Sequence, residues 1–216
     1  GKMEQVCLEK GIEFRKIEQL HSPRASFPSF LYSILNILSP ILLIKKEDVL
    51  KSIEELQKTQ NAISSNNISE TNPALSLAKW IKHIPVIYYP WGLQSVAIRF
   101  KNALQENSKN HVIIEDIVES CHNGIVAWER KSNVQPILIK GEDDHIKTNE
   151  KNKILKEYFQ VEKIEYKEII SVKGDILSKI INLSYILDYC TIYKAILTKT
   201  DPTPVRSIEF IKKRLK

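Results

Sequence analysis

The sequence has no apolar run of the length that marks a membrane-spanning helix, and its first residues do not follow the pattern of a secretory leader. No apolar stretch reaches the roughly 18 residues that a membrane-spanning helix needs. The apolar segment 31–44 is interrupted by Asn36, Ser39 and Pro40, and we interpret it as a buried helix. The first residues are charged and have no apolar core, so no secretory signal peptide is expected.

Cysteine and methionine are scarce. The three cysteines, Cys7, Cys121 and Cys190, are far apart and form no Cys-x-x-Cys pair, so neither a zinc site nor a disulfide framework is expected. A reducing cytoplasm is the compartment that this cysteine usage favours. The only methionine, Met3, follows two other residues, so we expect either two added residues or further sequence upstream.

Charge of one sign is not concentrated anywhere along the chain. The net charge is +6 and the isoelectric point is about 9.1, but Lys and Arg are mixed with Asp and Glu almost throughout. No aromatic RNA-binding motif or basic stripe is present, so nucleic-acid binding is not expected. Hydrophobic residues make up 43% of the chain, which is typical of a globular protein.

The first third of the chain has helical patterns separated by a turn and a polar linker. We expect a helix over 3–10 closed by Gly11, a strand over 12–20, a helix from Ser26 or Ser29 to Leu38, a charged helix over 46–61 and a polar linker over 64–73. In the charged helix, Val49, Ile53 and Leu56 form the apolar stripe.

From residue 74 onward, helical patterns alternate with short apolar runs. Strands are expected over 84–89, 111–114, 135–139 and 164–170, and helices over 74–81, 93–107, 124–128, 149–159 and 175–199. This alternation predicts βαβ units with right-handed crossovers, and therefore an α/β fold with a parallel sheet flanked by helices. Ligands of such sheets bind outside the carboxyl ends of the strands.

Two residues are candidates for proton transfer. Glu106 falls at the end of an apolar-faced helix, and His122 follows the predicted strand at His111. We expect both to point toward one edge of the sheet, where a base and an acid held apart suit an aldose–ketose isomerisation. A Glu at a helix end is more often a solvated charge, and a lone His is more often structural, so spacing alone does not establish an enzyme.

Several motifs resemble one known family. They are Asn72-Pro73-Ala74, the strand 84–88, Arg99-Phe100-Lys101 with Glu106-Asn107-Ser108-Lys109, His122-Asn123, and 201–205 with Ile208 and Lys212. Together they resemble the bifunctional phosphoglucose/phosphomannose isomerases of archaeal type, which are built from sugar isomerase (SIS) domains. The resemblance implies that 68–216 is the second SIS domain and that 1–67 is the end of the first plus a linker helix.

The resemblance also implies roles for individual residues. Glu106 corresponds to the base that moves a proton between C1 and C2, and His122 to the ring-opening histidine, which the neighbouring subunit of a homodimer supplies. Lys212 corresponds to a lysine that reaches the substrate, and Thr203, or in another register Val205, to a position tied to mannose 6-phosphate. The implied substrate is a phosphorylated hexose, without metal or cofactor.

Departures from the family pattern support a second hypothesis. Cys121 stands where the family has Asn, Gly124 stands where it has Glu, and no Ser/Thr-rich phosphate loop occurs in the chain. These changes favour a non-catalytic SIS domain that binds a sugar phosphate or a partner protein. A third hypothesis, a DNA-bound regulator, requires a helix-turn-helix that the sequence does not contain.

Other candidate sites carry less weight. The acidic run 142–145 suggests a metal site, but its position in a polar loop favours a solvated loop. Cys121 is a candidate reactive thiol without a signature that would orient a base. Arg24 lies in a turn and is interpreted first as structural.

Overall fold

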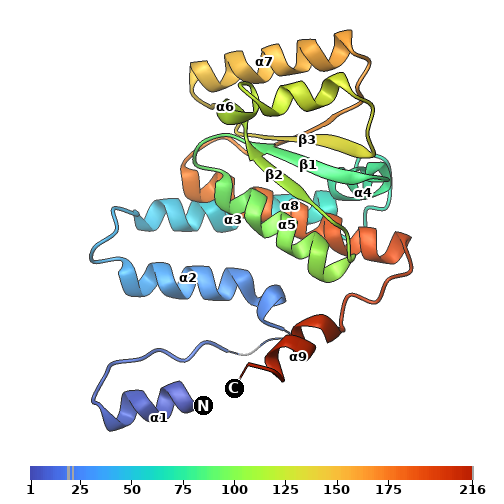
Figure 1. Ribbon diagram of the computed structural model, residues 1–216. Coiled ribbons are helices and arrows are strands. Elements are labelled where there is room, and N and C mark those ends of the chain that lie inside the picture. The colour runs from blue at the N-terminus through green and yellow to red at the C-terminus, as the bar shows by residue number, and fades with distance from the viewer. Residues whose placement is uncertain (19, 21, 216) are drawn as a thin grey trace. The chain divides into compact units, whose positions relative to one another are not determined.

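The computed structural model describes residues 1–18, 20 and 22–215 (Figure 1). The chain divides into two compact units, Gly1–Lys45 and Lys46–Lys216. The predicted start of the family domain at residue 68 concerns homology rather than packing and stays a prediction. In packing terms, the charged helix that precedes residue 68 belongs to the second unit.

The described residues of the first unit form α1 (Lys2–Glu9), the 3-10 helix η1 (Pro23–Ser26) and α2 (Phe27–Leu38). The predicted helix end at Gly11 is confirmed, because Gly11 follows α1 with a positive φ of 63°. The predicted strand over 12–20 is wrong for residues 12–18 and 20, and residue 19 lies outside the described residues. Alternating side chains favour a strand only where a second strand supplies hydrogen-bond partners.

The predicted helix from Ser26 or Ser29 to Leu38 is confirmed as α2. The interpretation of 31–44 as a buried helix is wrong, because none of the residues of α2 is fully buried. A unit of this size has too little chain to enclose an apolar helix on all sides.

The second unit has the predicted parallel α/β architecture. Its elements are α3 (Lys46–Ile63), α4 (Pro73–Trp80), β1 (Ile84–Tyr89), α5 (Gln94–Asn107), β2 (Ile113–Asp116), α6 (Ile117–Ser120), η2 (Gly124–Glu129), β3 (Val134–Lys140), α7 (Ile146–Val161), β4 (Lys167–Ile170), α8 (Ile176–Leu197) and α9 (Arg206–Lys212). The four strands are parallel and lie in the order β2-β1-β3-β4. The fold class predicted from the sequence is therefore confirmed.

The sheet is buried between two layers of helices (Figure 1). Ile87, Ile137 and Ile169 face α4, α5 and α8 on one side. Tyr88 and Leu138 face the other side, where they pack with Phe159 of α7. Successive strand residues point to opposite faces, so nearly continuous apolar strands such as β1 serve both layers.

The long helix α8 lies against α3, α4 and α5. By length and composition alone, this 22-residue helix could cross a membrane, although the sequence contains no uninterrupted apolar run of that length. In the structure, 61% of its apolar window is buried. Contacts with three helices explain why α8 is apolar around most of its circumference.

The helix α3 packs on α8, and Val49 and Leu56 of the predicted stripe are half-buried. Ser52 and Ile63 are its buried residues, and Thr59 Oγ1 accepts a hydrogen bond of 2.7 Å from Asn182 Nδ2 of α8. The predicted stripe residue Ile53 is instead 38% exposed. Polar side chains occupy this contact because each hydroxyl finds a partner.

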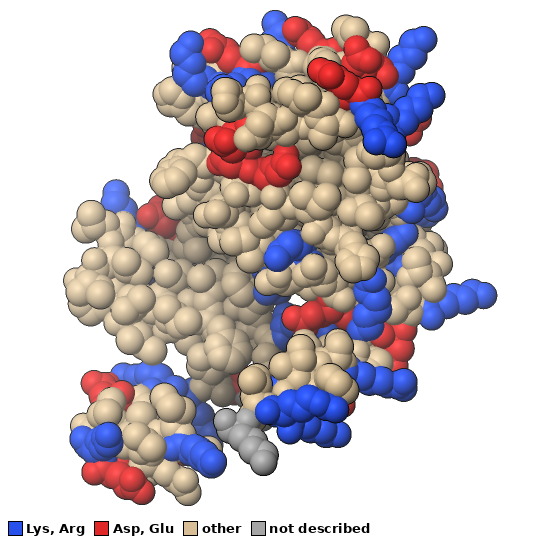
Figure 2. Space-filling view, in the orientation of Figure 1, with Lys and Arg blue, Asp and Glu red and all other residues tan. Residues whose placement is uncertain are grey.

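Charged side chains of both signs interleave on the outer surface of α7, at the top of Figure 2. Lys147 pairs with Glu150 and Lys153 with Glu157 along this helix. Exposed pairs at this spacing stabilise a helix by a few tenths of a kcal/mol each, about 0.3–0.5. The mixing of charges seen in the sequence is thus preserved on this helix.

Candidate active site

A pocket of about 550 Å³ lies where the end of α5 meets the segment that leads into α9. It is lined by Asn102, Gln105, Glu106, Lys109, Pro204, Val205, Arg206, Ser207 and Ile208. One carboxylate, one ammonium and one guanidinium therefore come together beside apolar side chains. Convergent polar groups in such a hollow are the usual features of a ligand site.

The last turn of α5 is fixed by buried hydrogen bonds. Asn107 is only 7% exposed, and its Nδ2 donates to Thr191 Oγ1 of α8 at 2.8 Å. Ser108 follows as the C-cap, and Lys109 then adopts a positive φ of 58°, which ends the helix. Glu106 is half-buried beside these residues, so the pocket holds its carboxylate on a rigid element.

The opposite wall of the pocket is a turn. The backbone N–H of Thr203 donates to Asp201 Oδ1 at 2.8 Å, and this bond is the main reason that the pKa of Asp201 lies below its ordinary value. Lys109 links the two walls, because its Nζ donates to Glu106 O at 2.5 Å and to Pro204 O at 2.8 Å.

A largely buried ion pair supports α5 before the pocket. Arg99 Nη2 lies 2.5 Å from Asp188 Oδ2 of α8, and Arg99 Nε donates to the same oxygen at 3.2 Å. Burial raises the pKa of Asp188, and the attraction of Arg99 only partly opposes that effect. Arg99 of the family-like motif therefore has a structural role here.

His122 lies beyond the other end of β2. α5 ends before β2 begins and α6 begins after β2 ends, so Glu106 and His122 are placed at opposite edges of the sheet. The expectation that both point toward one edge is wrong within a single chain. A helix that joins two parallel strands must run back to the start of the next strand, which carries its last residue to the amino edge.

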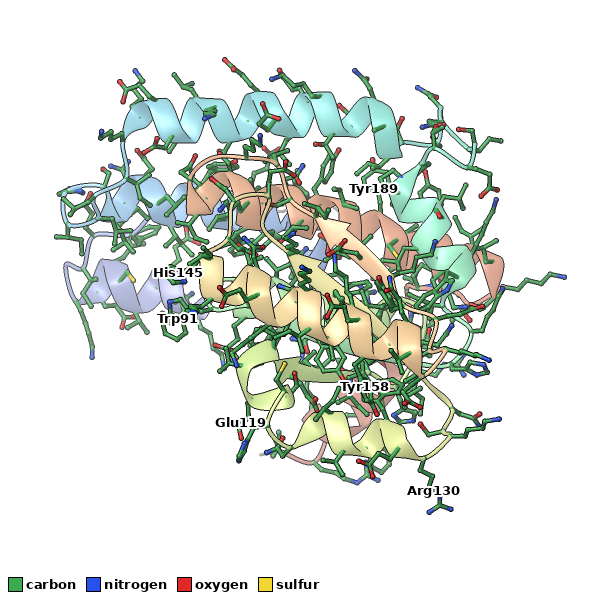
Figure 3. All side chains as sticks on the ribbon, turned by 90° about the horizontal axis from the view of Figure 1, so that it is seen from above. Trp91, Glu119, Arg130, His145, Tyr158 and Tyr189 are labelled. Atoms are coloured by element: carbon green, nitrogen blue, oxygen red, sulfur yellow. The ribbon has the colours of Figure 1, made fainter. Side chains whose placement is uncertain are left out.

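The turn that carries His122 is exposed at the carboxyl edge. The His122 N–H donates to Glu119 O at 2.9 Å, and Asn123 Nδ2 donates to Glu119 Oε1 at 3.0 Å. Figure 3 shows Glu119 at the left end of the sheet, together with Trp91 and His145, whereas Arg130 lies at the right. The imidazole of His122 is accessible to a molecule outside the chain.

Glu115 is a candidate residue that sequence reasoning missed. A Cβ added to Gly124 would lie 2.6 Å from Glu115 Oε2, so this carboxylate occupies the space of a side chain at position 124. Glu115 Oε2 is buried and has no hydrogen-bond partner among the described residues. Burial raises the pKa of Glu115. No spacing in the sequence signals this contact, because it joins β2 to a turn after α6.

Of the remaining predicted residues, Val205 lines the pocket, and Thr203 and Lys212 are not among the described residues that line it. Of the two register alternatives, Val205 lines the pocket, whereas Thr203 lies two residues earlier and is exposed. Lys212 is the last residue of α9 and is exposed. α9 itself was not predicted, because prolines precede it and its apolar residues Phe210 and Ile211 stay exposed.

The weaker candidates do not form sites in the described part of the chain. Within the loop 142–145, Asp143 pairs with Lys179 and Asp144 Oδ2 accepts from the Gly141 N–H at 2.7 Å. Among the described residues, no group of three or more metal-ligating side chains is found. Burial raises the pKa of the Cys121 thiol, which disfavours the reactive thiolate.

The sequence matches one family model over residues 70–215, described as the bacterial phospho-glucose isomerase C-terminal SIS domain. It is 27% identical over its whole length to a bifunctional phosphoglucose/phosphomannose isomerase of Caldicellulosiruptor bescii and 26% identical to one of Aquifex aeolicus. The chain spans 66% and 65% of the length of these relatives. It is also 26% identical, over 96% of its length, to a bifunctional phosphoglucose/phosphomannose isomerase of Thermoplasma acidophilum. The expectation of an archaeal type stays a prediction.

Solved structures share the fold. A glucose-6-phosphate isomerase like protein of Thermus thermophilus superimposes with a TM-score of 0.68 at 17% identity, covering 85% of this chain and 62% of that one. Glucosamine-6-phosphate deaminase of Thermotoga maritima gives a TM-score of 0.56 at 13% identity, covering 82% of this chain and 53% of that one. At these identities the likeness concerns the fold alone.

Proposed function

Because the chain belongs to the family of bacterial phospho-glucose isomerase C-terminal SIS domains, we propose that it acts in the reversible isomerisation of glucose 6-phosphate to fructose 6-phosphate. Mannose 6-phosphate is the second proposed substrate. The observation that carries the proposal is the placement of Glu106 in a pocket with cationic side chains, on a helix end fixed from both sides. We place the reaction in a reducing cytoplasm.

The proposed chemistry is a proton transfer through an enediol. Glu106 removes the proton from C2 of the open-chain aldose and returns it to C1, while a proton moves from the C2 hydroxyl to the C1 oxygen. The reaction neither releases a proton nor changes the oxidation state of the sugar as a whole. A positioned carboxylate is therefore sufficient as the base, without a metal or an organic cofactor.

Ring opening is assigned to His122 of a second copy of the chain. His122 is exposed and lies beyond the opposite end of β2 from Glu106, so one chain alone does not bring the two side chains together. In a symmetric dimer, the carboxyl edge of one copy faces the pocket of the other, and each active site contains one Glu106 and one His122. The imidazole then exchanges a proton with the ring oxygen.

The segment around α9 is proposed to hold the substrate. Val205 lines the pocket and Thr203 precedes it, which makes this turn the candidate for distinguishing glucose from mannose 6-phosphate. Lys212 ends α9, where its charge is available to the phosphate or to a sugar oxygen.

Replacement of the base tests the proposal. In the natural full-length protein, Glu106→Gln should lower fructose 6-phosphate production in a coupled assay by about 10²- to 10⁴-fold, because the amide cannot accept the C2 proton. Circular dichroism should remain unchanged. The matched control Glu157→Gln, on the exposed surface of α7, should retain full activity.

A non-catalytic sugar-phosphate binder is the second candidate. It is favoured by the surroundings of His122, where Cys121 holds a thiol of raised pKa and Glu115 fills the space beside Gly124. Binding of fructose 6-phosphate by the wild-type protein without turnover in either direction would support this candidate and reject the isomerase.

A further inference from the structure

Among the described residues, Lys109 is one of three lysines, with Lys163 and Lys199, that follow a helix with a positive φ, and of these three it is the one that lines the pocket. It follows α5 directly, it adopts a positive φ of 58°, and its side chain lines the same pocket as Glu106. A non-glycine residue in this backbone region is uncommon and directs its side chain differently from its helical neighbours. Here the side chain turns back over the helix end, where Nζ bonds Glu106 O at 2.5 Å.

The ammonium group also reaches across the pocket. Nζ donates to Pro204 O at 2.8 Å, so one side chain joins the helix end that carries Glu106 to the turn that carries Val205. Both acceptors are uncharged carbonyl oxygens, and neither cancels the positive charge. The positive charge of Lys109 also acts on a neighbouring carboxylate, because it contributes to lowering the pKa of Asp201.

An ammonium group has three N–H donors. Two of those of Lys109 are used by carbonyl oxygens within the described part of the chain, which leaves one for a molecule in the pocket. The group is therefore held in position by the protein before a ligand arrives. Donors fixed in advance stabilise a developing negative charge without the cost of reorganisation.

We propose that Lys109 is the oxyanion-stabilising residue of this pocket, and that its third N–H donates to the sugar oxygen that becomes negative when Glu106 removes the C2 proton. This inference rests on the proposed isomerase function. No bond to nitrogen forms and Lys109 stays protonated throughout. The carbon-bound proton passes from C2 to Glu106 and then to C1, while the proton of the C2 hydroxyl moves to the C1 oxygen, as in the proposed isomerisation.

A lysine within α5 serves as the comparison for Lys109, which follows that helix. Lys101 lies on α5, is half-buried and is not among the described residues that line the pocket. Replacement of either lysine by methionine removes one positive charge and keeps most of the side-chain volume. A general loss of charge on α5 would affect both variants alike.

The test compares Lys109→Met, Lys109→Arg and Lys101→Met in the natural full-length protein. Lys109→Met should lower kcat for fructose 6-phosphate formation by about 10²-fold, with a much smaller change in KM, because the bond strengthens only as charge develops. Lys109→Arg should recover part of this loss, since a guanidinium keeps the charge and donors. Lys101→Met should match the wild type.

A second readout separates catalysis from structure. Arabinonate 5-phosphate carries a carboxylate where the enediolate forms, so Lys109→Met should weaken its binding by a larger factor than it weakens fructose 6-phosphate binding. Equal weakening of both, or an unchanged kcat, would overturn the inference. The Glu106→Gln variant distinguishes failure of the isomerase proposal from failure of the Lys109 proposal. If Glu106→Gln abolishes turnover while Lys109→Met does not, the isomerase function is supported and the proposed role of Lys109 is rejected. An inactive wild-type protein would reject both.

Discussion

At the scale of single residues, the contact between Glu115 and position 124 is the least expected feature of the chain. Glu115 Oε2 occupies the space of a side chain at Gly124 and has no partner among the described residues. Burial disfavours the charged carboxylate and raises the pKa of Glu115. A carboxyl group with a raised native pKa stabilises the fold below its unfolded-state pKa, and that stability is lost as pH rises through the native pKa.

Glu115→Gln should therefore raise the melting temperature at about pH 8 and change it much less at about pH 4, where the wild-type carboxyl is largely protonated. The amide resembles the protonated acid and avoids the burial of a charge. Thermal unfolding followed by circular dichroism at both pH values measures the effect. Glu129→Gln, at the exposed end of η2, should leave both temperatures unchanged. A stabilisation that is larger at the acidic pH would contradict the sign derived from burial.

Glu106 and Glu115 illustrate which features of the candidate site could be predicted from the sequence and which could not. Glu106 at a helix end was predicted, because its helix has a clear apolar pattern. The edge at which it lies follows from the direction of α5 between two parallel strands, so it was within reach of sequence reasoning. The contact between Glu115 and position 124 could not be predicted from the sequence, because it depends on the three-dimensional space beside Gly124.

At the scale of elements, α8 acts as the support on which the pocket helix is fixed. Thr191 of α8 accepts from Asn107, and Asp188 of the same helix pairs with Arg99. Both contacts lie on the face of α5 that turns toward α8, and both involve groups that are largely buried. The helix end that carries Glu106 is thus held by polar contacts of fixed geometry rather than by apolar packing alone.

Thr191→Val should destabilise the protein by about 1–3 kcal/mol, because it leaves the buried amide of Asn107 without its acceptor while keeping the side-chain volume. Urea unfolding at neutral pH measures the free energy of unfolding. Thr191→Ser keeps the hydroxyl and should cost less, despite the loss of a methyl group. Thr198→Val, at the exposed end of α8, should stay near the wild type. An equal cost at positions 191 and 198 would show that the bond to Asn107 is unimportant.

The elements that the sequence predicted well are those that bury at least one face in the core. β1, α5, β3 and α7 lie close to their expected ranges, because strong apolar periodicity reflects burial in a two-layer core. The strand over 12–20 failed and α9 was missed for the opposite reason. In both segments the apolar residues remain exposed, so their pattern carried little information about structure.

At the scale of the whole molecule, the separation of Glu106 and His122 is the central result. They lie beyond opposite ends of β2, at the amino and carboxyl edges of one sheet. A single copy of this unit therefore presents the carboxylate of Glu106 in a pocket at one edge and the exposed imidazole of His122 at the other. The proposed isomerase requires that a second copy supply His122 to the pocket that contains Glu106. Its activity is therefore expected of an assembly rather than of one chain.

Mixing two inactive variants of the natural full-length protein tests this requirement most directly. Glu106→Gln and His122→Ala would be purified separately, dissociated, mixed in equal amounts and assayed for fructose 6-phosphate production. If each site combines Glu106 of one copy with His122 of another, hybrid dimers contain one intact site, and activity should return to about one quarter of the wild-type level. Active separate variants, or inactivity of a mixture shown to contain hybrid dimers, would contradict the shared site.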